Sequence, residues 1–160
     1  MPREISLFST LKTIKMKKGQ VSGTIPPSLF TLSNLERIDL DYNKLTGKLP
    51  TLTTNITSLQ RLDLNFNNLT GPIDAIRFLP NVQVAMLDNN ALTGTIPSGI
   101  GDLTNLRALT LHGNNFHGDM PDSICQLRKY NGGNLDYLMA DCDGDVPKVN
   151  CTCCSHCNPY

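Results

Sequence analysis

The sequence predicts an α/β solenoid with a parallel β-ladder on its concave side, an irregular or 3-10 helical convex side and a cysteine-rich C-terminal cap. Three observations lead to this prediction. A leucine pattern recurs about every 24 residues, each recurrence holds one short strand, and five of the six cysteines lie between Cys142 and Cys157. A repeat of this size cannot bury its own apolar residues, so successive repeats must stack.

The repeat itself is regular. The segment LERIDLDYNKLTG at 35–47 returns as LQRLDLNFNNLTG at 59–71. Repeats start at 11, 35, 59, 82 and 106, so the starts are 24, 24, 23 and 24 residues apart. We therefore expect five repeats over 11–134, and a last strand with the cap over 135–160. Residues 1–10 match the second half of a truncated repeat, which predicts that the chain is part of a longer protein. The alternative is a short protein whose first half repeat serves as a poor cap.

The two halves of the repeat predict different local structures. The Leu-x-x-Leu-x-Leu half alternates apolar residues as a strand with one buried face does, and stacked strands lie about 4.8 Å apart. An asparagine follows, whose side chain can satisfy the backbone groups left open by the turn. Glycine and proline in the second half favour an irregular or short helical segment there. The asparagines in question are Asn43, Asn67, Asn90 and Asn114.

Composition excludes several function classes. The chain has 14 basic and 14 acidic residues and a formal charge of zero, so no overall field draws it to nucleic acid or to a membrane. The lysines over 12–18 lack the length and the aromatic residues of a nucleic-acid site. No apolar run approaches the roughly 18 residues that span a bilayer, so we expect no membrane insertion. No signal peptide is visible in the first 20 residues.

The cysteine cluster has two interpretations. Thiolates with His156 could bind zinc, but zinc sites usually draw on two separated ligand pairs. Six cysteines can instead form three disulfides in 15 ways, and we expect disulfides and no metal or cofactor. Disulfides, together with three Asn-x-Thr triplets, favour an extracellular or secretory, oxidising compartment. The cysteines are Cys125, Cys142, Cys151, Cys153, Cys154 and Cys157, and the candidate glycosylation sites are Asn55, Asn68 and Asn150.

Variable residues between the leucines should line the concave surface, because side chains alternate across a strand. Tyr42 and Phe66 are the predicted anchors for a ligand, since exposed aromatics contribute strongly to interfaces. The aspartates could orient a basic or hydroxyl-rich ligand. Alternatively Lys15 pairs with Asp39 and Lys17 with Asp41 across the ladder. The predicted ligand-binding residues are Lys15, Lys17, Arg37, Asp39, Asp41, Tyr42, Arg61, Asp63, Phe66, Met86, Asp88 and His112.

Catalytic motifs are missing from the sequence. None of the three histidines lies in a nucleophile or metal motif, so we expect no enzyme. Asp141, Asp143 and Asp145 alternate like the start of a calcium loop, but Val146 stands where the loop needs glycine. An acidic turn is the favoured interpretation.

The repeat consensus, Leu-x-x-Leu-x-Leu-x-x-Asn-x-Leu-x-Gly-x-Ile-Pro, resembles the plant-type leucine-rich repeats of receptor kinases, receptor-like proteins and polygalacturonase-inhibiting proteins. The cysteine pattern of the cap is similar to that of secreted diatom and algal leucine-rich-repeat proteins. The resemblance implies a right-handed superhelix whose concave face recognises a protein, a peptide or a glycan. A structural subunit of a larger assembly, or an inhibitor of a wall-degrading enzyme, are the alternatives.

Overall fold

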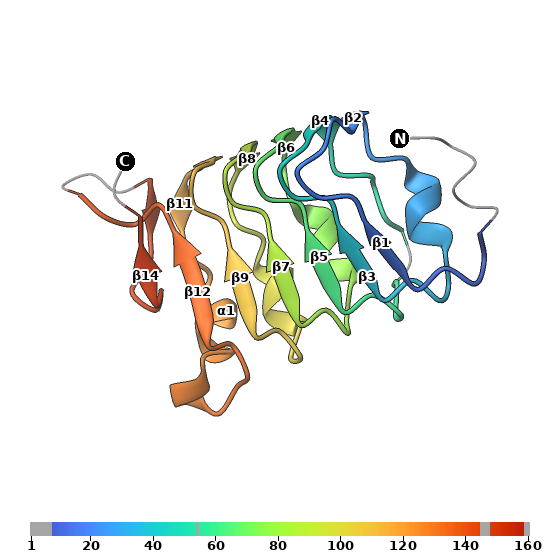
Figure 1. Ribbon diagram of the computed structural model, residues 1–160. Helices are drawn as coiled ribbons and strands as arrows, with labels where there is room; N and C mark the ends of the chain where they lie inside the picture. Colours follow the sequence, from blue (N-terminus) through green and yellow to red (C-terminus); the bar gives the residue numbers. More distant parts are fainter. Residues whose placement is uncertain (1–7, 54, 145–147, 159–160) are drawn as a thin grey trace.

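The computed structural model describes residues 8–53, 55–144 and 148–158. One short strand from each repeat joins a parallel sheet that follows the order of the repeats along the chain (Figure 1). The predicted parallel ladder is therefore confirmed, and the cap adds the last strand to it. The strands are β1 (Thr13–Lys15), β3 (Arg37–Asp39), β5 (Arg61–Asp63), β7 (Val84–Met86), β9 (Ala108–Thr110), β12 (Tyr137–Ala140) and β14 (His156–Cys157).

The core runs without interruption through the stack. The middle residue of each ladder strand points inward, and in-register partners such as Ile38 and Leu62 are 0% and 1% exposed. One repeat buries little by itself, whereas neighbouring repeats complete each other's apolar surface. Burial of these leucines, at about 25 cal/mol per Å² of apolar surface, is what holds the solenoid together.

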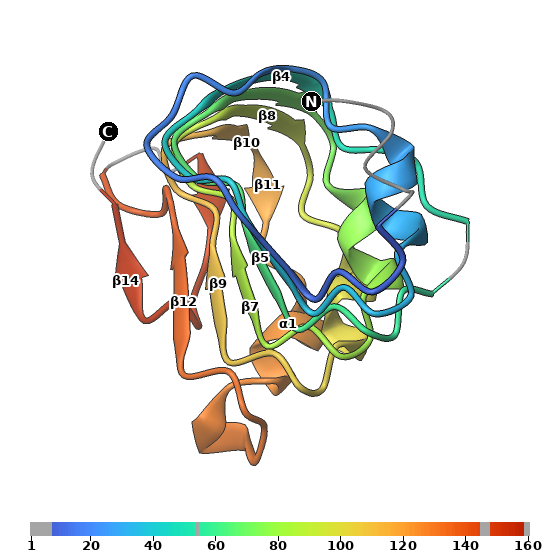
Figure 2. The ribbon, with the colours of Figure 1, turned by 45° about the vertical axis from the view of Figure 1, so that its right-hand side comes forward.

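A second parallel sheet lies where the chain leaves the asparagine turn, and this sheet was not predicted. Figure 2, which looks more nearly along the stack, shows this second sheet along the top of the view, beyond the carboxyl ends of the ladder strands. Its strands have two to five residues, too few for an apolar alternation to reveal them in the sequence. In spatial order they are β10 (Asn115–Phe116), β8 (Ala91–Gly94), β6 (Asn68–Gly71), β4 (Lys44–Lys48) and β2 (Ser22–Gly23).

The asparagines connect the two sheets. Asn67 Oδ1 accepts a hydrogen bond from the Leu45 backbone N–H at 2.9 Å. Its Nδ2 donates to the Leu40 and Leu64 carbonyls, both at 3.0 Å. Each asparagine thus satisfies backbone groups of its own repeat and of the preceding one, as the sequence predicts.

Among the described residues, short helices cover the convex side in every repeat but the second. They are η2 (Pro27–Thr31), η3 (Asp74–Phe78), η4 (Ser98–Asp102) and α1 (Asp122–Gln126), with η5 (Lys129–Asn131) in the loop before β12. Leu29 and Ile100, the inward residues of η2 and η4, are fully buried. Thr53 takes that place in the second repeat and is exposed. Among the described residues, no helix is long and apolar enough to cross a membrane.

Three disulfides hold the cap, so the disulfide interpretation of the cysteine cluster is confirmed. Cys125 pairs with Cys153, Cys142 with Cys157, and Cys151 with Cys154. The first closes a separation of 28 residues, and a loop of that length is worth about 3.5 kcal/mol in the chain-entropy account. Sulfur atoms of Cys142, Cys151 and Cys154 lie within 4.8 Å of one another, but all three are already in disulfides. The cap has two more short strands, β11 (Gly118–Asp119) and β13 (Val149–Asn150), which pair with each other.

The Asp141 carboxylate accepts the hydrogen bonds of the turn N–H groups in the last full repeat. In earlier repeats the backbone N–H groups at the turn donate to carbonyls of the next repeat, as Asn43 donates to Phe66 at 3.1 Å. The N–H groups of Gly113 and Asn114 donate instead to the Asp141 carboxylate, at 2.9 and 3.3 Å. Asp141 therefore has a structural role and is only 4% exposed, which differs from the acidic, solvated turn that the sequence favours. Asp145 and Val146 lie outside the described residues.

Candidate functional site: the concave face

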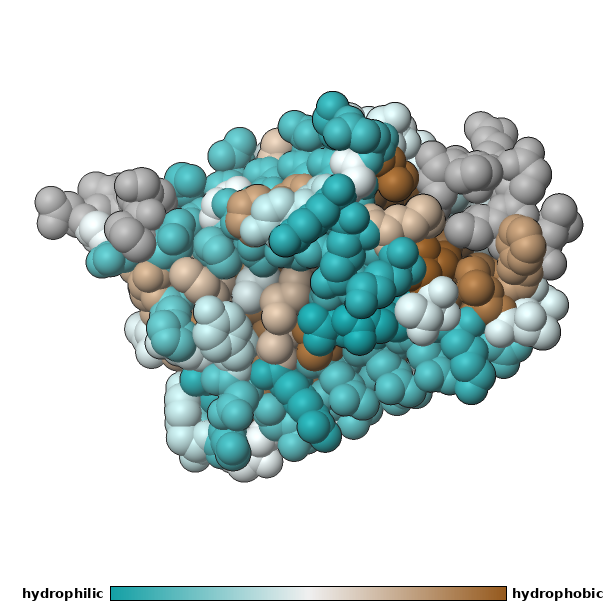
Figure 3. Space-filling view, in the orientation of Figure 1, coloured by the Kyte–Doolittle hydropathy of each residue, from teal (hydrophilic) through white to brown (hydrophobic). Residues whose placement is uncertain are grey.

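The ladder register places the variable residues in two rows along the concave face. Arg37 pairs with Arg61, and Asp39 pairs with Asp63. A space-filling view shows this face as largely hydrophilic, with hydrophobic residues gathered toward the N-terminal end (Figure 3). One row holds Thr13, Arg37, Arg61, Val84, Ala108 and Tyr137, and the next holds Lys15, Asp39, Asp63, Met86, Thr110 and Met139.

The aspartates of this face lie beneath the arginines. Asp39 is 0% and Asp63 is 3% exposed. Arg37 Nη2 lies 3.1 Å from Asp39 Oδ2, and Arg61 Nε lies 2.8 Å from Asp63 Oδ2. A ligand would therefore meet guanidinium groups first. This differs from the expectation that the aspartates themselves orient a ligand, because strand position predicts which face a side chain takes but not how deeply it is covered.

Lys17 pairs with two of the aspartates. Its Nζ lies 3.1 Å from Asp39 Oδ1 and 3.4 Å from Asp41 Oδ1. The expected pairing of Lys17 with Asp41 is present, whereas Lys15 is in ladder register with Asp39 but exposed and forms no ion pair with it. The first two repeats are therefore partly self-paired.

Burial raises the pKa values of the aspartates, whereas hydrogen bonds and ion pairs with Lys17, Arg37 and Arg61 lower them. Burial works to raise the pKa of Asp39, but hydrogen bonds with Asp41, Lys17 and Arg37 outweigh it and hold that pKa below its ordinary value. Burial, and then the shared hydrogen bond with Asp39, raise the pKa of Asp41. Burial also raises the pKa of Asp63, because the single guanidinium of Arg61 offsets only part of the desolvation. The hydrogen bond to Asp39 raises the pKa of Lys17.

A hollow of about 300 Å³ lies at the edge of the ladder where the strands begin. Gln60 and Gln83, each directly before a ladder strand, contribute side-chain amides to it, and Arg37 and Arg61 contribute guanidinium groups. Glu36, whose carboxylate lies 3.2 Å from Lys12 Nζ, also lines the hollow. The amides and guanidinium groups offer hydrogen-bond donors that suit carboxylate or peptide carbonyl oxygens. The two glutamines were not predicted, although their place before each strand, like that of Glu36, is visible in the repeat.

Tyr42 and Phe66 lie at the opposite rim, just beyond the ends of β3 and β5. They are 44% and 38% exposed, and their rings stack with centroids 4.1 Å apart and planes inclined by 11°. Lys18 Nζ lies 5.7 Å from the Tyr42 ring centroid. The two aromatics form a continuous apolar surface on a mostly polar face. The predicted anchor residues are therefore side by side and open to solvent.

The rim residues share an uncommon backbone conformation. Tyr42 and Phe66 both have φ of 54°, in the left-handed region. Asn89 and Gly113, at the same place in the next two repeats, also have positive φ, at 54° and 65°. Asparagine and glycine adopt this conformation readily, whereas it is unfavourable for bulky side chains. Since the turn accepts asparagine or glycine, its backbone gives no reason for the aromatic residues there.

Asp88 and Thr110, which are buried, and His112, which is partly exposed, form a polar group further along the face. Thr110 Oγ1 donates to Asp88 Oδ1, and His112 Nε2 lies 3.8 Å from Asp88 Oδ2. Asp88 stands between the hydroxyl and the imidazole, so the histidine has no direct hydrogen bond with which to activate Thr110 as a nucleophile. Met86 lies beside this group, with its sulfur 3.3 Å from Thr110 Oγ1. These predicted site residues favour a binding surface over a hydrolytic centre.

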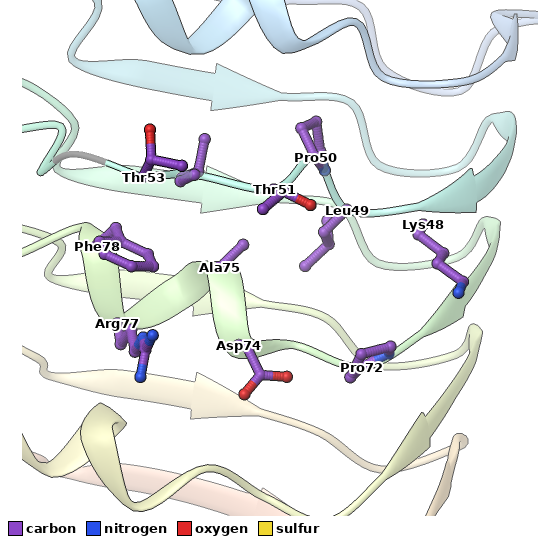
Figure 4. Close-up of a pocket in the computed structure, with 11 residues that line it drawn as sticks. Lys48, Leu49, Pro50, Thr51, Thr53, Pro72, Asp74, Ala75, Arg77 and Phe78 are labelled. Atoms are coloured by element: carbon purple, nitrogen blue, oxygen red, sulfur yellow. The ribbon is translucent and has the colours of Figure 1, made fainter.

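A larger hollow, of about 550 Å³, lies on the convex side and not on the ladder. Figure 4 shows its walls: the extended segment with Thr51 and Thr53 on one side, and Ala75 and Phe78 of η3 on the other. It opens where the second repeat has no helix. None of the predicted ligand-binding residues lines it.

Comparison with known proteins supports the assignment of the fold. A family model described as leucine rich repeat matches residues 9–69, and another with the same description matches residues 105–127. A search of curated proteins finds no match to this chain.

Solved structures give longer matches. The ectodomain of the Arabidopsis thaliana receptor kinase GASSHO1/SCHENGEN3, in complex with CASPARIAN STRIP INTEGRITY FACTOR 2, is 30% identical over 94% of this chain, with a TM-score of 0.78. A TDR receptor is 35% identical over 94% of this chain, also with a TM-score of 0.78. A plant ice-binding protein is 26% identical over 94% of this chain, with a TM-score of 0.76. This chain covers 19%, 24% and 45% of those three chains respectively.

Proposed function

The chain is a leucine-rich repeat protein of the plant type, and we propose that it is a recognition module that binds an extended peptide across its concave face. The observation that carries the proposal is the pairing of a donor-rich edge at Arg37 and Arg61 with an exposed aromatic rim at Tyr42 and Phe66. The two features lie at opposite ends of the same two strands. A ligand that contacts both needs an acidic group and an apolar group in one chain.

The separation of the two features suits a short peptide. Five residues of extended backbone separate Arg37 from Tyr42, which corresponds to at most roughly 16 Å. A peptide of about five extended residues spans that distance. Carboxylate oxygens fit the guanidinium groups in two-bond geometry, and an apolar side chain fits the stacked rings.

The similar structures support this class of ligand. The GASSHO1/SCHENGEN3 ectodomain was solved with CASPARIAN STRIP INTEGRITY FACTOR 2, and another similar structure, the receptor kinase HAESA, with the peptide hormone IDA and a co-receptor. Three disulfides support an extracellular or secretory, oxidising location. A glycan ligand, a structural role in an assembly and inhibition of a wall-degrading enzyme remain the alternatives from the sequence.

A displayed random-peptide library tests the proposal. Peptides would be selected on the wild-type protein and counter-selected on a variant carrying Tyr42→Asn, Phe66→Asn and Arg61→Met. We expect enrichment of peptides with an acidic residue and an apolar residue about five positions apart. Peptides that bind the triple variant equally well would contradict the proposed site, and co-purification of the protein with a partner at fixed stoichiometry would favour the structural role.

A second candidate function rests on the five-stranded sheet. Ser22, Thr46, Thr70 and Thr93 occupy equivalent, exposed positions in four successive repeats. One similar structure is a plant ice-binding protein, although the sheet register pairs Thr46 with Asn68 and Thr70 with Ala91, so these hydroxyls do not lie directly opposite one another. The row ends at His117, and Lys44 and Lys48 project from the same sheet, so we place this function second. Loss of a freezing-point depression on changing Thr70 to lysine would support it.

A further inference from the structure

The second repeat leaves a polar hollow on the convex side that the peptide-binding proposal does not use. The segment after Pro50 contains Thr51 and Thr53, β-branched residues that disfavour a helix, and its described residues form none. Beyond the hollow of Figure 4, a second one of about 320 Å³ opens between this segment and η2. Its walls include the hydroxyls of Thr31, Ser33 and Ser58, with Asn55 and Ile56.

Asn55 lies at the same hollow and begins an Asn-Ile-Thr triplet. Its side chain is exposed, and no hydrogen bond to another described residue holds it. The backbone behind it is fixed, because Ile56 N–H donates to the Phe78 carbonyl at 2.8 Å and Asn81 Nδ2 donates to the Thr57 carbonyl at 2.7 Å. A group attached to Asn55 would therefore leave from a defined point beside the hollow.

The other two triplets are placed differently. Asn68 is exposed, but the residue after it, Leu69, is completely buried in the core. Asn150 Nδ2 donates to Asp119 Oδ1 at 3.0 Å, and the next residue, Cys151, is in a disulfide. Modification at Asn150 would break an interaction of the cap, whereas modification at Asn55 breaks none.

We propose that Asn55 carries an N-linked oligosaccharide whose first sugars lie in the hollow beside η2. Asn55 Nδ2 forms a bond to the anomeric carbon of a lipid diphosphate-linked oligosaccharide and loses one proton, and the lipid diphosphate leaves. This inference depends on the secretory location proposed above but not on peptide binding, which uses the opposite face.

Site mapping tests the modification. The full chain would be secreted from a eukaryotic host, its glycans released by an amidase in ¹⁸O-labelled water, and its peptides analysed by mass spectrometry. We expect the label, which marks conversion to aspartate, at Asn55 and not at Asn150. Secreted protein without label at Asn55 would overturn the proposal, and peptide-binding measurements on the same material would show separately whether the proposed function holds.

Thermal unfolding tests whether the sugars fill the hollow. Released protein carries aspartate at position 55, so the Asn55→Asp variant is its matched control. We expect release to lower the melting temperature by about 2–4 °C, to the value of that control. A melting temperature unchanged by release would show that the sugars do not lie in the hollow.

Discussion

Tyr42 and Phe66 stack face to face with ring centroids 4.1 Å apart, while both hold a left-handed backbone with φ of 54°. The left-handed conformation costs roughly 1–2 kcal/mol per residue, and an aromatic pair returns about 0.5–1.5 kcal/mol. Stacking therefore offsets at most part of the strain. Residues kept against a conformational cost are candidates for a functional role, and here they form the exposed apolar part of the proposed binding face.

Replacing the rim aromatics should separate stability from binding. We expect the unfolding free energy of the Tyr42→Asn/Phe66→Asn variant to lie within about 1 kcal/mol of the wild-type value, because asparagine adopts the left-handed backbone with less strain, as at Asn89. We expect the same variant to bind selected peptides at least tenfold more weakly. Urea unfolding and isothermal titration check the two parts, with Tyr130→Asn, a change outside the ladder, as control. Full affinity in the rim variant would remove these residues from the site.

Arg61 should matter both to the ligand and to the carboxylate beneath it. Arg61→Met leaves Asp63 buried without its cation, and we expect a loss of about 1–3 kcal/mol of unfolding free energy. Adding Asp63→Asn should recover most of the stability but none of the affinity for acidic peptides. Denaturant titration of both variants checks this, and Lys44→Met on the other sheet is the matched control. Recovered affinity in the double variant would show that the guanidinium does not contact the ligand.

Asp63 should also give stability a specific pH dependence. Because its pKa is raised in the folded protein, its contribution is fully present below the ordinary value of 3.8 and is lost as pH rises through the folded value. The unfolding free energy of wild type minus that of Asp63→Asn should therefore fall from acid toward neutral pH. Asp39, whose pKa is lowered, should show the opposite trend. Denaturant unfolding at several pH values measures both differences, and a constant Asp63 difference would contradict the assignment.

The asparagine ladder predicts a large effect from a small change. Asn67→Ala removes the acceptor of the Leu45 N–H and the donors to the Leu40 and Leu64 carbonyls. We expect a loss of about 2–4 kcal/mol, since the backbone groups left behind are buried. The neighbouring exposed Asn68→Ala should change stability by about 0.5 kcal/mol or less. Equal effects of the two changes would show that the ladder is not the source of stability.

Periodicity was sufficient to predict the ladder, its rows and the turn asparagines, because these depend only on spacing. It could not predict that Arg37 and Arg61 cover the carboxylates of Asp39 and Asp63, because this depends on the conformations of the arginine side chains. Nor could it choose among the cysteine pairings, because pairing depends on how the cap folds over the last repeat.

One local signal was present but easily missed. Thr53 stands where Leu29 and Ile100 anchor their helices, so the sequence already marks the second repeat as the one without a helix. The left-handed rim is less visible in sequence. Asparagine and glycine at two of its positions suggest it, but tyrosine and phenylalanine at two others argue against it.

The most direct test of the concave binding site is amide hydrogen exchange on the protein with and without a peptide selected from the library. Binding across the proposed face should slow exchange in β3, β5 and the turns at Tyr42 and Phe66, and leave the convex helices unchanged. Protection confined to the five-stranded sheet or the convex side, with none in β3 and β5, would contradict the proposed site.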